Sequence, residues 1–541
     1  MDKGKVLIVD GYSTGKYYAD RLKERGITPF HLTSGMEKNT SLPQDVIEKY
    51  IASQIGTSYQ TTYLMPDSLQ SLLEEFGKHN FAAVIPGTES GVEVAERLSE
   101  YFKLPSNDFK TVALRRDKHL MQQALKNAGL KYISFLKTAK VEEALSWIEK
   151  NNFKKIVIKP LMSAGTDGVK VCEDKDSVKK AFESLIGTKD GFGRKNDEVL
   201  VEQFIEGKEI VVNCVSRGGE HILTDVMIYN KILTVDKNPV YDASLLIKNL
   251  TPEFKECVDY TFKVLNVLGI KYGASHTEIM LTPEGPVLIE TGARVMGRLS
   301  EIYWEALGRN SIDLILDSYL DGVKHKENML KPYNPKKSFL YKYFISYANA
   351  EISSLPVFDS LGELPCVREL TFALARQSMR VKKTIDMPTM PGEGVFISEQ
   401  EEEIINAYKT ARFLEVCAPG LLYEPKDAVP MAFEKELLAK IKDKGSLCDE
   451  YDTLFKGFEL KYKDFENSVL YVLNDLMLPC LNGEIGDVYI AGKQLYEDKR
   501  TKETLIPNPF YSVFLPVAAE PFLFKTGDKG RIEKTGEIKI L

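Results

Sequence analysis

The stretch GASHTEIMLTPEGPVLIETGAR, residues 273–294, says more about the fold than any other part of the chain. Two runs rich in apolar and β-branched residues lie on either side of Pro283-Glu284-Gly285. Because glycine suits the left-handed position of a short loop, this pattern predicts a β-hairpin with a three-residue loop. With that loop length Thr282 pairs with Pro286, and this pair sets the register of the whole hairpin.

In this register Glu278 lies directly opposite Glu290 on one face, and Ile279 lies opposite Ile289 on the other. Two opposed carboxylates repel each other, and sheets normally avoid such pairs. A bound divalent cation would remove the conflict, because Mg²⁺ takes carboxylate oxygens together with substrate phosphates. An acidic edge whose charges water screens would also explain the pair, so the hairpin alone leaves both interpretations open.

The bulk properties indicate a globular protein of several domains. A chain of 541 residues is too long for one core, and about three or four domains are expected. The net charge of −7, with charges of both signs mixed along the chain, argues against a nucleic-acid surface. No apolar run is long enough to span a bilayer, so no membrane partner is expected. Seven cysteines and six histidines are scattered without metal-ligand spacing, which predicts buried, reduced thiols, a cytoplasmic protein and no zinc centre.

The pattern of elements changes along the chain. Residues 1–110 alternate strands such as VLIVD with helices, which predicts α/β structure around a parallel sheet. Residues 330–420 carry further mixed signals and close with a helix. Beyond Pro419-Gly420, residues 421–465 have a charged, helical pattern, and residues 466–541 are β-rich with turns.

Two lysines stand where phosphates could bind. Lys159 ends an apolar strand and precedes a loop of small residues, 163–168. Such a loop can lay backbone N–H groups over phosphates while the lysine supplies a point charge, although a plain hairpin tip has the same composition. Lys118 begins a predicted helix, where a solvated surface lysine is the ordinary interpretation. A P-loop is excluded at 11–16, because the segment is one residue too short and lacks the final Ser or Thr.

The segment EVLVEQFIEGKE, residues 198–209, places Glu202 and Glu209 on either side of a short turn at Glu206-Gly207. Its apolar side chains could form a slot, and the backbone at 203–205 could present the N–H and C=O that an adenine edge needs. Glu209 could accept hydrogen bonds from ribose hydroxyls. Read alone, the segment is an edge strand followed by a turn.

Taken in order, these segments resemble the ATP-grasp superfamily over about residues 1–420. The resemblance is carried by five motifs: RRDKHLMQ at 115–122, VIKPLMSAGTDGV at 157–169, VLVEQFIEGKEIVV at 199–212, HTEIM at 276–280 and LIETGAR at 288–294. Together with PGTESG at 86–91, the SAG loop and the HTEIM and LIETGAR motifs are most similar to L-amino-acid ligases of the bacilysin-synthetase type. Those enzymes join two amino acids or similar units with ATP.

The resemblance implies an ATP-grasp fold of mixed α/β and α+β character. The domains it implies are an N-terminal α/β (pre-ATP-grasp) domain over 1–110, a two-lobed ATP-grasp domain over 111–329 with its phosphate-loop lobe at about 130–197, a C-terminal α+β domain over 330–420, and an additional domain over 421–541. The role of this additional domain is open.

The resemblance also implies roles for single residues. Those that match nucleotide-binding positions are Lys118 and Lys159 for the phosphates, Ser163, Ala164 and Gly165 in the mobile phosphate loop, Glu202 with the backbone of Gln203, Phe204 and Ile205 for adenine, and Glu209 for ribose. Glu278 and Glu290 match the carboxylates that bind two Mg²⁺ ions. Arg294 matches the arginine that stabilises an acyl phosphate, so Arg294 and Lys159 are expected to be catalytic.

Three further positions belong to the expected site. His276 lies two residues before Glu278 on the same face, so it should point into the site as a catalytic or substrate-contacting residue. Glu89 in the PGTES segment is expected to receive the ammonium group of a substrate. Gly292 is a departure, because many ATP-grasp enzymes have asparagine there, and it leaves the geometry of the second metal open.

The implied reaction is ATP-dependent ligation of a carboxylate to an amine. The carboxylate is activated as an acyl phosphate and becomes an amide, with ADP and phosphate released. The expected partners are small carboxylate and amine substrates, amino acids above all, and a second copy of the chain in a homodimer. Another ATP-grasp ligation, a carboxylation and a non-catalytic nucleotide-binding scaffold are the alternatives. A protein kinase is excluded, because Arg115-Arg116-Asp117 lacks the histidine and no DFG motif follows.

Overall fold

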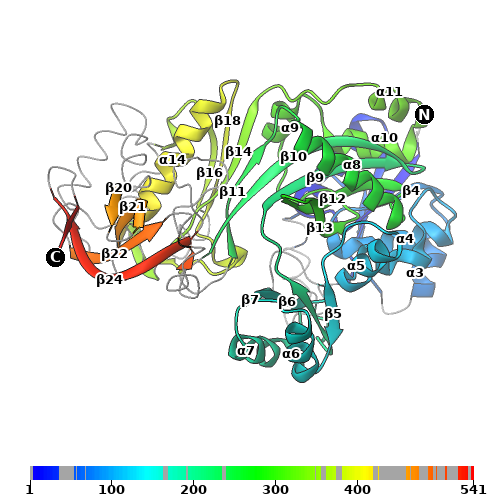
Figure 1. The fold of residues 1–541 in the computed structure, drawn as a ribbon. Coiled ribbons are helices and arrows are strands. Elements are labelled where there is room, and N and C mark those ends of the chain that lie inside the picture. The colour runs from blue at the N-terminus through cyan, green and yellow to red at the C-terminus, as the bar shows by residue number, and fades with distance from the viewer. Residues whose placement is uncertain are drawn as a thin grey trace. The chain divides into compact units, whose positions relative to one another are not determined.

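The computed structural model divides the chain into two compact units that contain both helices and strands (Figure 1). The first unit holds Met1–Ile228 and Leu246–Lys336, and the second holds Tyr229–Leu245 and Lys337–Leu541. The structure describes residues 4–35, 51, 54–55, 58–66, 69–162, 168–190, 193–233, 239–347, 349–354, 361–372, 380–417, 424–425, 458–462, 465–473, 485–491, 495, 506–507, 522–533 and 538–541.

A parallel sheet of four strands forms the N-terminal part of the first unit, in the order β3-β2-β1-β4. Its elements are β1 (Lys5–Val9), β2 (Thr28–Leu32), β3 (Thr61–Tyr63) and β4 (Phe81–Pro86), with helices α1 (Tyr17–Glu24), α3 (Leu69–Phe76) and α4 (Val92–Tyr101). All four residues of the run VLIV at 6–9 are fully buried, so both faces of this sheet are covered. The predicted α/β structure with a parallel sheet is therefore confirmed.

The next part of the first unit is a small antiparallel sheet in the order β5-β8-β6-β7. Its elements are β5 (Phe135–Thr138), α6 (Val141–Lys150), β6 (Ile156–Pro160), β7 (Lys170–Cys172), α7 (Lys175–Leu185) and β8 (Val199–Gln203). Helices α6 and α7 lie side by side against the sheet (Figure 1). Asp174 caps α7 through a reciprocal pair of bonds with Ser177, which explains why this helix begins where it does.

A third sheet carries the acidic hairpin, and within the first unit its strands follow the order β13-β12-β9-β10. These are β9 (Lys208–Arg217), β10 (Glu220–Leu233), β12 (Tyr272–Thr282) and β13 (Gly285–Gly292). The surrounding helices are α5 (Lys118–Asn127), α8 (Pro252–Val267), α9 (Glu301–Leu307), α10 (Ser311–Leu320) and α11 (Gly322–Met329). Helix α8 packs on β12 and β13, and α10 packs on β9 and β12, so the hairpin is held between helices.

The hairpin confirms the predicted pairing of its two glutamates and corrects the rest of the register. Glu278 pairs with Glu290, but Ile279 pairs with Leu288 and Thr282 pairs with Gly285. The loop therefore has two residues, and a bulge between the two glutamates and the loop absorbs the extra residue, Ile289. The predicted three-residue loop and the pairing of Ile279 with Ile289 are wrong, because the bulge changes the register halfway along the hairpin.

The second unit contains strands β11 (Pro239–Leu246), β14 (Ser338–Tyr343), β18 (Glu393–Ser398) and β16 (Val367–Thr371), paired in that order. Helix α14 (Glu401–Cys417) packs on β14 and β18. At this contact Lys342 is fully buried, and its Nζ lies 2.7 Å from Asp242 Oδ1 and 2.8 Å from Glu415 Oε1. Arg412 lies 2.6 Å from Glu415 Oε2, so two buried cations are matched by two buried anions.

Most of the described residues beyond 420 lie in strands. These strands are β19 (Glu424–Pro425), β20 (Phe458–Tyr462), β21 (Phe465–Leu473), β22 (Ile485–Ala491), β23 (Ile506–Pro507), β24 (Phe522–Ile532) and β25 (Ile538–Ile540). The predicted helical character of 421–465 is wrong where the structure describes it, since β19 and β20 lie there, and the rest of that segment lies outside the described residues. None of the helices in the described part of the chain has the length and hydropathy that a bilayer crossing requires.

Candidate active site

The segment that carries Glu89 is held by close backbone contacts. It follows β4 and forms a short 3-10 turn, Glu89–Gly91. A Cβ at Gly87 would lie 2.4 Å from the carbonyl oxygen of Asp10, and one at Gly91 would lie 2.5 Å from that of Val9. Only glycine fits at both positions, so the PGTESG motif sits tightly against the end of β1 and fixes the backbone of Glu89.

Both carboxylate oxygens of Glu89 contact guanidinium groups. Oε1 accepts a hydrogen bond from Nη1 of Arg116, and Oε2 accepts one from Nε of Arg294 at 3.1 Å. Burial alone would raise the pKa of Glu89, but the charges of Arg116, Arg294 and Lys118 outweigh it and lower the pKa. Glu89 is therefore an ionised carboxylate between two arginines. The sequence predicted a contact of Glu89 with a substrate ammonium group and did not predict these two arginine contacts.

Gly292 explains how Glu89 reaches this position. A Cβ at Gly292 would lie 2.5 Å from Oε2 of Glu89 and 3.5 Å from Nε of Arg294. The space that an asparagine would occupy in many ATP-grasp enzymes is filled here by the carboxylate of Glu89. The sequence singled out Gly292 as a departure, but only the fold shows which residue uses the room.

The two predicted metal carboxylates lie side by side on β12 and β13, as expected. Glu278 is buried, while the side chain of Glu290 is 26% exposed and pairs with Nζ of Lys118 at 2.8 Å. Hard oxygen donors in this pairing fit Mg²⁺. Among the described residues no group of three or more His, Cys, Asp or Glu side chains is arranged to hold a metal ion. A cation on these two glutamates would thus need other oxygens, and nucleotide phosphates supply them.

His276 lies beside Glu278, on the face that the sequence predicts. Its Nε2 is 3.5 Å from Oε1 of Glu278, and its Nδ1 is 2.8 Å from Oδ1 of Asn213 on the neighbouring strand β9. Nδ2 of Asn213 in turn donates to Oδ1 of Asp225, at 2.5 Å. Because the side-chain nitrogen of Asn213 donates to Asp225, its amide oxygen faces His276 and accepts a hydrogen bond from Nδ1.

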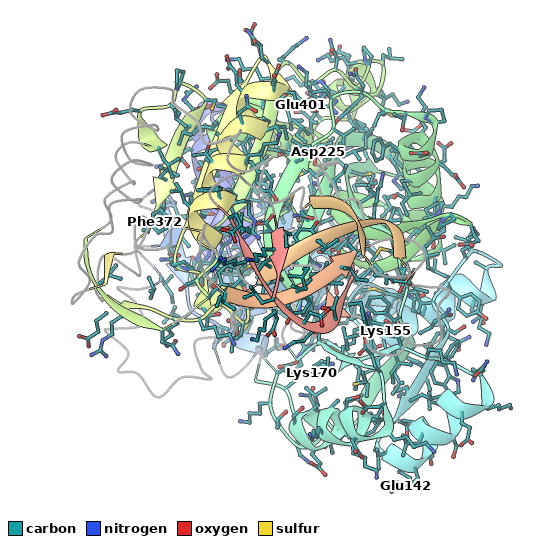
Figure 2. The ribbon with its side chains drawn as sticks, turned by 60° about the vertical axis from the view of Figure 1, so that its left-hand side comes forward. Glu142, Lys155, Lys170, Asp225, Phe372 and Glu401 are labelled. Carbon is teal, nitrogen blue, oxygen red and sulfur yellow. The ribbon has the colours of Figure 1, made fainter. Side chains whose placement is uncertain are left out.

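Asn213 and Asp225 are functional candidates that the sequence did not identify. Asp225 on β10 (labelled in Figure 2) is only 1% exposed, and burial raises its pKa against the opposing hydrogen bond from Asn213. The sequence gives one indication of Asn213, since its amide stands inside the apolar run VVNCV. Its contact with His276 could not be predicted, because it depends on the pairing of β9 with β12.

Lys159 on β6 and Glu202 on β8, the two central strands of the small sheet, form a buried ion pair. Nζ of Lys159 lies 2.7 Å from Oε2 of Glu202, and the two side chains are 6% and 3% exposed. The other carboxylate oxygen of Glu202 is buried without a hydrogen-bond partner among the described residues. The backbone N–H of Lys118 donates to the carbonyl of Leu161 at 3.1 Å, which brings the starts of α5 and of the predicted phosphate loop together.

The predicted adenine hinge begins at Gln203, the last residue of β8. The N–H of Gln203 donates to the carbonyl oxygen of Ser134 at 3.0 Å, and the N–H of Phe204 donates to the carbonyl oxygen of Lys155 at 3.2 Å. Neither of these two hydrogen bonds involves the backbone of Ile205. The ammonium of Lys155 (Figure 2) lies 4.2 Å from the centre of the Phe204 ring. Glu209 lies further along, on β9 opposite Met280. Of the predicted phosphate loop, Ser163, Ala164 and Gly165 lie outside the described residues.

These features together are those of an ATP-grasp enzyme: the three sheets, the opposed carboxylates of the hairpin, and two lysines that each pair with a glutamate. Residues 116–297 match the model of the phosphoribosylglycinamide synthetase ATP-grasp (A) domain. Dapdiamide A synthase of Enterobacter agglomerans is 32% identical over 397 residues, which cover 72% of this chain and 91% of that protein.

Solved structures show the same fold. An L-amino acid ligase from Bacillus licheniformis has a TM-score of 0.58 at 16% identity, covering 76% of this chain and 98% of its own. A phosphoribosylglycinamide synthetase from Anaerococcus prevotii has a TM-score of 0.54 at 15% identity, covering 76% and 98%. The chain belongs to the ATP-grasp family. It is an ADP-forming carboxylate–amine ligase that forms amide bonds and uses ATP with Mg²⁺.

Proposed function

We propose that this ligase joins two amino acids, activating the carboxyl group of the first as an acyl phosphate. The observation that carries the proposal is that a positive group, Arg116–Glu89–Arg294, lies close to the Glu278–Glu290 pair. The two are linked through Arg116 and Lys118, which are two residues apart in the chain, since Lys118 pairs with Glu290. The two arginines and one carboxylate leave one positive charge, which suits a carboxylate next to a phosphate. The relative from Bacillus licheniformis, an L-amino acid ligase, supports amino acids as the substrates.

On the nucleotide side we assign Lys118 and Lys159 to the phosphates. Each lysine pairs with a carboxylate, Glu290 or Glu202, and each can turn from that partner to a phosphate oxygen. Mg²⁺ bound by Glu278 and Glu290 would neutralise phosphate charge. We assign the hinge backbone at 203–205 to adenine and Glu209 to ribose, with the 163–168 loop covering the phosphates.

On the acyl side we assign Arg294 to the transferred phosphoryl group and the carboxylate that receives it. The carboxylate oxygen bonds to the γ-phosphorus while the bond to ADP breaks, and the amine then attacks the acyl carbon and expels phosphate. His276, held by Asn213, faces this region beside Glu278 and is assigned to contact with the substrate. Exclusion of water is needed because water would hydrolyse the acyl phosphate.

The proposal is tested by ADP release against the twenty common amino acids, singly and in pairs, with product masses measured alongside. The expected result is release that needs a particular pair and a product of the summed mass less one water. ADP release that depends on bicarbonate and on no amine would instead indicate a carboxylation. Nucleotide binding without ADP release under any of these conditions would indicate a scaffold.

A further inference from the structure

We propose that Glu89 is a positioning residue that holds Arg294 in place, and that Gly292 is glycine so that Glu89 can do so. This inference rests on the proposed function only for its kinetic test. It replaces the expectation that Glu89 receives a substrate ammonium group.

The contacts of Glu89 support a bridge between two cations. One oxygen is taken by Nη1 of Arg116 and the other by Nε of Arg294, so an ammonium group would have to compete with both guanidinium groups. Arg116 is the more buried of the two partners, since its side chain is 5% exposed against 18% for Arg294. Arg116 therefore anchors Glu89, and Glu89 orients the more exposed Arg294.

The backbone of Glu89 is also held in place by its neighbours. Gly87 and Gly91 bring its turn against β1, so the carboxylate enters the site from a rigid base. Nε of Arg294 is bound by Glu89, while Nη1 donates to the carbonyl of Val295 at 3.2 Å. Glu89 binds one edge of the guanidinium group, and Nη2 takes part in neither of these bonds.

Gly292 leaves the space that the carboxylate of Glu89 occupies. The Cβ of any other residue would lie 2.5 Å from Oε2 of Glu89, closer than non-bonded atoms approach. A side chain at 292 would therefore displace the carboxylate from Arg294. The glycine at this position and the glutamate at 89 depend on each other, although they are far apart in the sequence.

The first test needs no substrate. Arg294 is modified with phenylglyoxal, and its rate of modification is followed by peptide mass spectrometry, with exposed Arg298 as the internal reference. Glu89→Gln and Gly292→Ala should each expose Arg294 and raise its rate severalfold over wild type. The matched controls are Glu93→Gln, an exposed glutamate on α4, and Gly297→Ala, whose Cβ would meet only Oγ of Ser13 at 3.5 Å. Both controls should leave the rate of Arg294 unchanged.

The second test is a double-mutant cycle of Glu89→Gln and Arg294→Ala. It uses the amino acid that releases most ADP in the twenty-member panel, with hydroxylamine trapping the acyl phosphate. Glu89→Gln alone should lower kcat by about 10- to 100-fold, the effect of moving a reacting group by about 1 Å. In the Arg294→Ala background, the same change should have no further effect on kcat or on the affinity for that amino acid.

Three outcomes separate the possibilities. Effects of Glu89→Gln and Arg294→Ala that multiply would overturn the proposal, since an ammonium receptor acts independently of Arg294. An unchanged modification rate of Arg294 in both Glu89→Gln and Gly292→Ala would overturn it as well. If wild type releases no ADP with any amino acid, the proposed substrate class fails, and the modification rates still decide the role of Glu89.

Discussion

Lys159→Met isolates the buried ion pair with Glu202, and the structure sets the size of its effect. The side chains are 6% and 3% exposed, and their charged atoms lie 2.7 Å apart. Removing one partner of a buried pair costs about 3–5 kcal/mol, because the remaining charge is left uncompensated. Lys159→Met should therefore lower the stability of the small β5-β8-β6-β7 lobe by about that amount.

The double variant Lys159→Met/Glu202→Leu separates stability from nucleotide binding. Replacing both charges with apolar side chains should restore most of the lost stability. ATP affinity should stay about 10- to 100-fold below wild type in both variants, because a hydrogen bond to a charged group contributes about 1.5–3 kcal/mol.

Urea unfolding and calorimetry measure these two effects. Trp147 lies on α6 of the same lobe, and with Trp304 replaced by phenylalanine it reports on the unfolding of that lobe alone. Wild-type stability in Lys159→Met would refute the buried pair. Wild-type ATP affinity in both variants would refute the assignment of Lys159 to the phosphates.

Two further predictions concern the hairpin and the N-terminal sheet. Glu290→Gln should lower Mg²⁺-dependent turnover by about 10²-fold or more while the chain stays folded, because a metal ligand contributes several kcal/mol to charge stabilisation; full turnover at saturating Mg²⁺ would show that the hairpin is only an acidic edge. Burial lowers the pKa of His31 from 6.5 to about 4. As the pH falls, the unfolded chain therefore binds this proton before the folded chain does. The free energy of unfolding should decrease by up to about 3 kcal/mol between pH 6.5 and 4. His31→Gln, which keeps an acceptor for the N–H of Gly11, should flatten that part of the stability profile measured by urea unfolding, whereas an unchanged slope would contradict the assignment.

The sequence predicted the elements that periodicity and turn residues determine. Helix α5 begins at Lys118, where the sequence predicted the start of a helix. The opposed pair Glu278–Glu290 was also predicted correctly, because the extra residue in the bulge offsets the one-residue error in the predicted loop length. The bulge at Ile289 has no local signal, since an isoleucine suits a regular strand as well as a bulge.

Partners that are distant in the sequence were not predictable in the same way. Lys118 and Glu290 pair across 172 positions, and nothing near either residue indicates the other. The same holds for Glu89, whose two arginines come from different parts of the chain. A carboxylate in a loop signals a polar contact, but whether its partner is an ammonium group or a guanidinium group depends on packing that only the fold provides.

The measurement that tests the central claim most directly follows a carboxylate oxygen through the reaction. The amino acid that releases most ADP is supplied with ¹⁸O in its carboxyl group, together with ATP, Mg²⁺ and the amine partner. Activation as an acyl phosphate predicts that each amide bond formed transfers one labelled oxygen to the inorganic phosphate, with ADP as the nucleotide product. Label recovered in AMP, or unlabelled phosphate released together with the amide, would contradict the account.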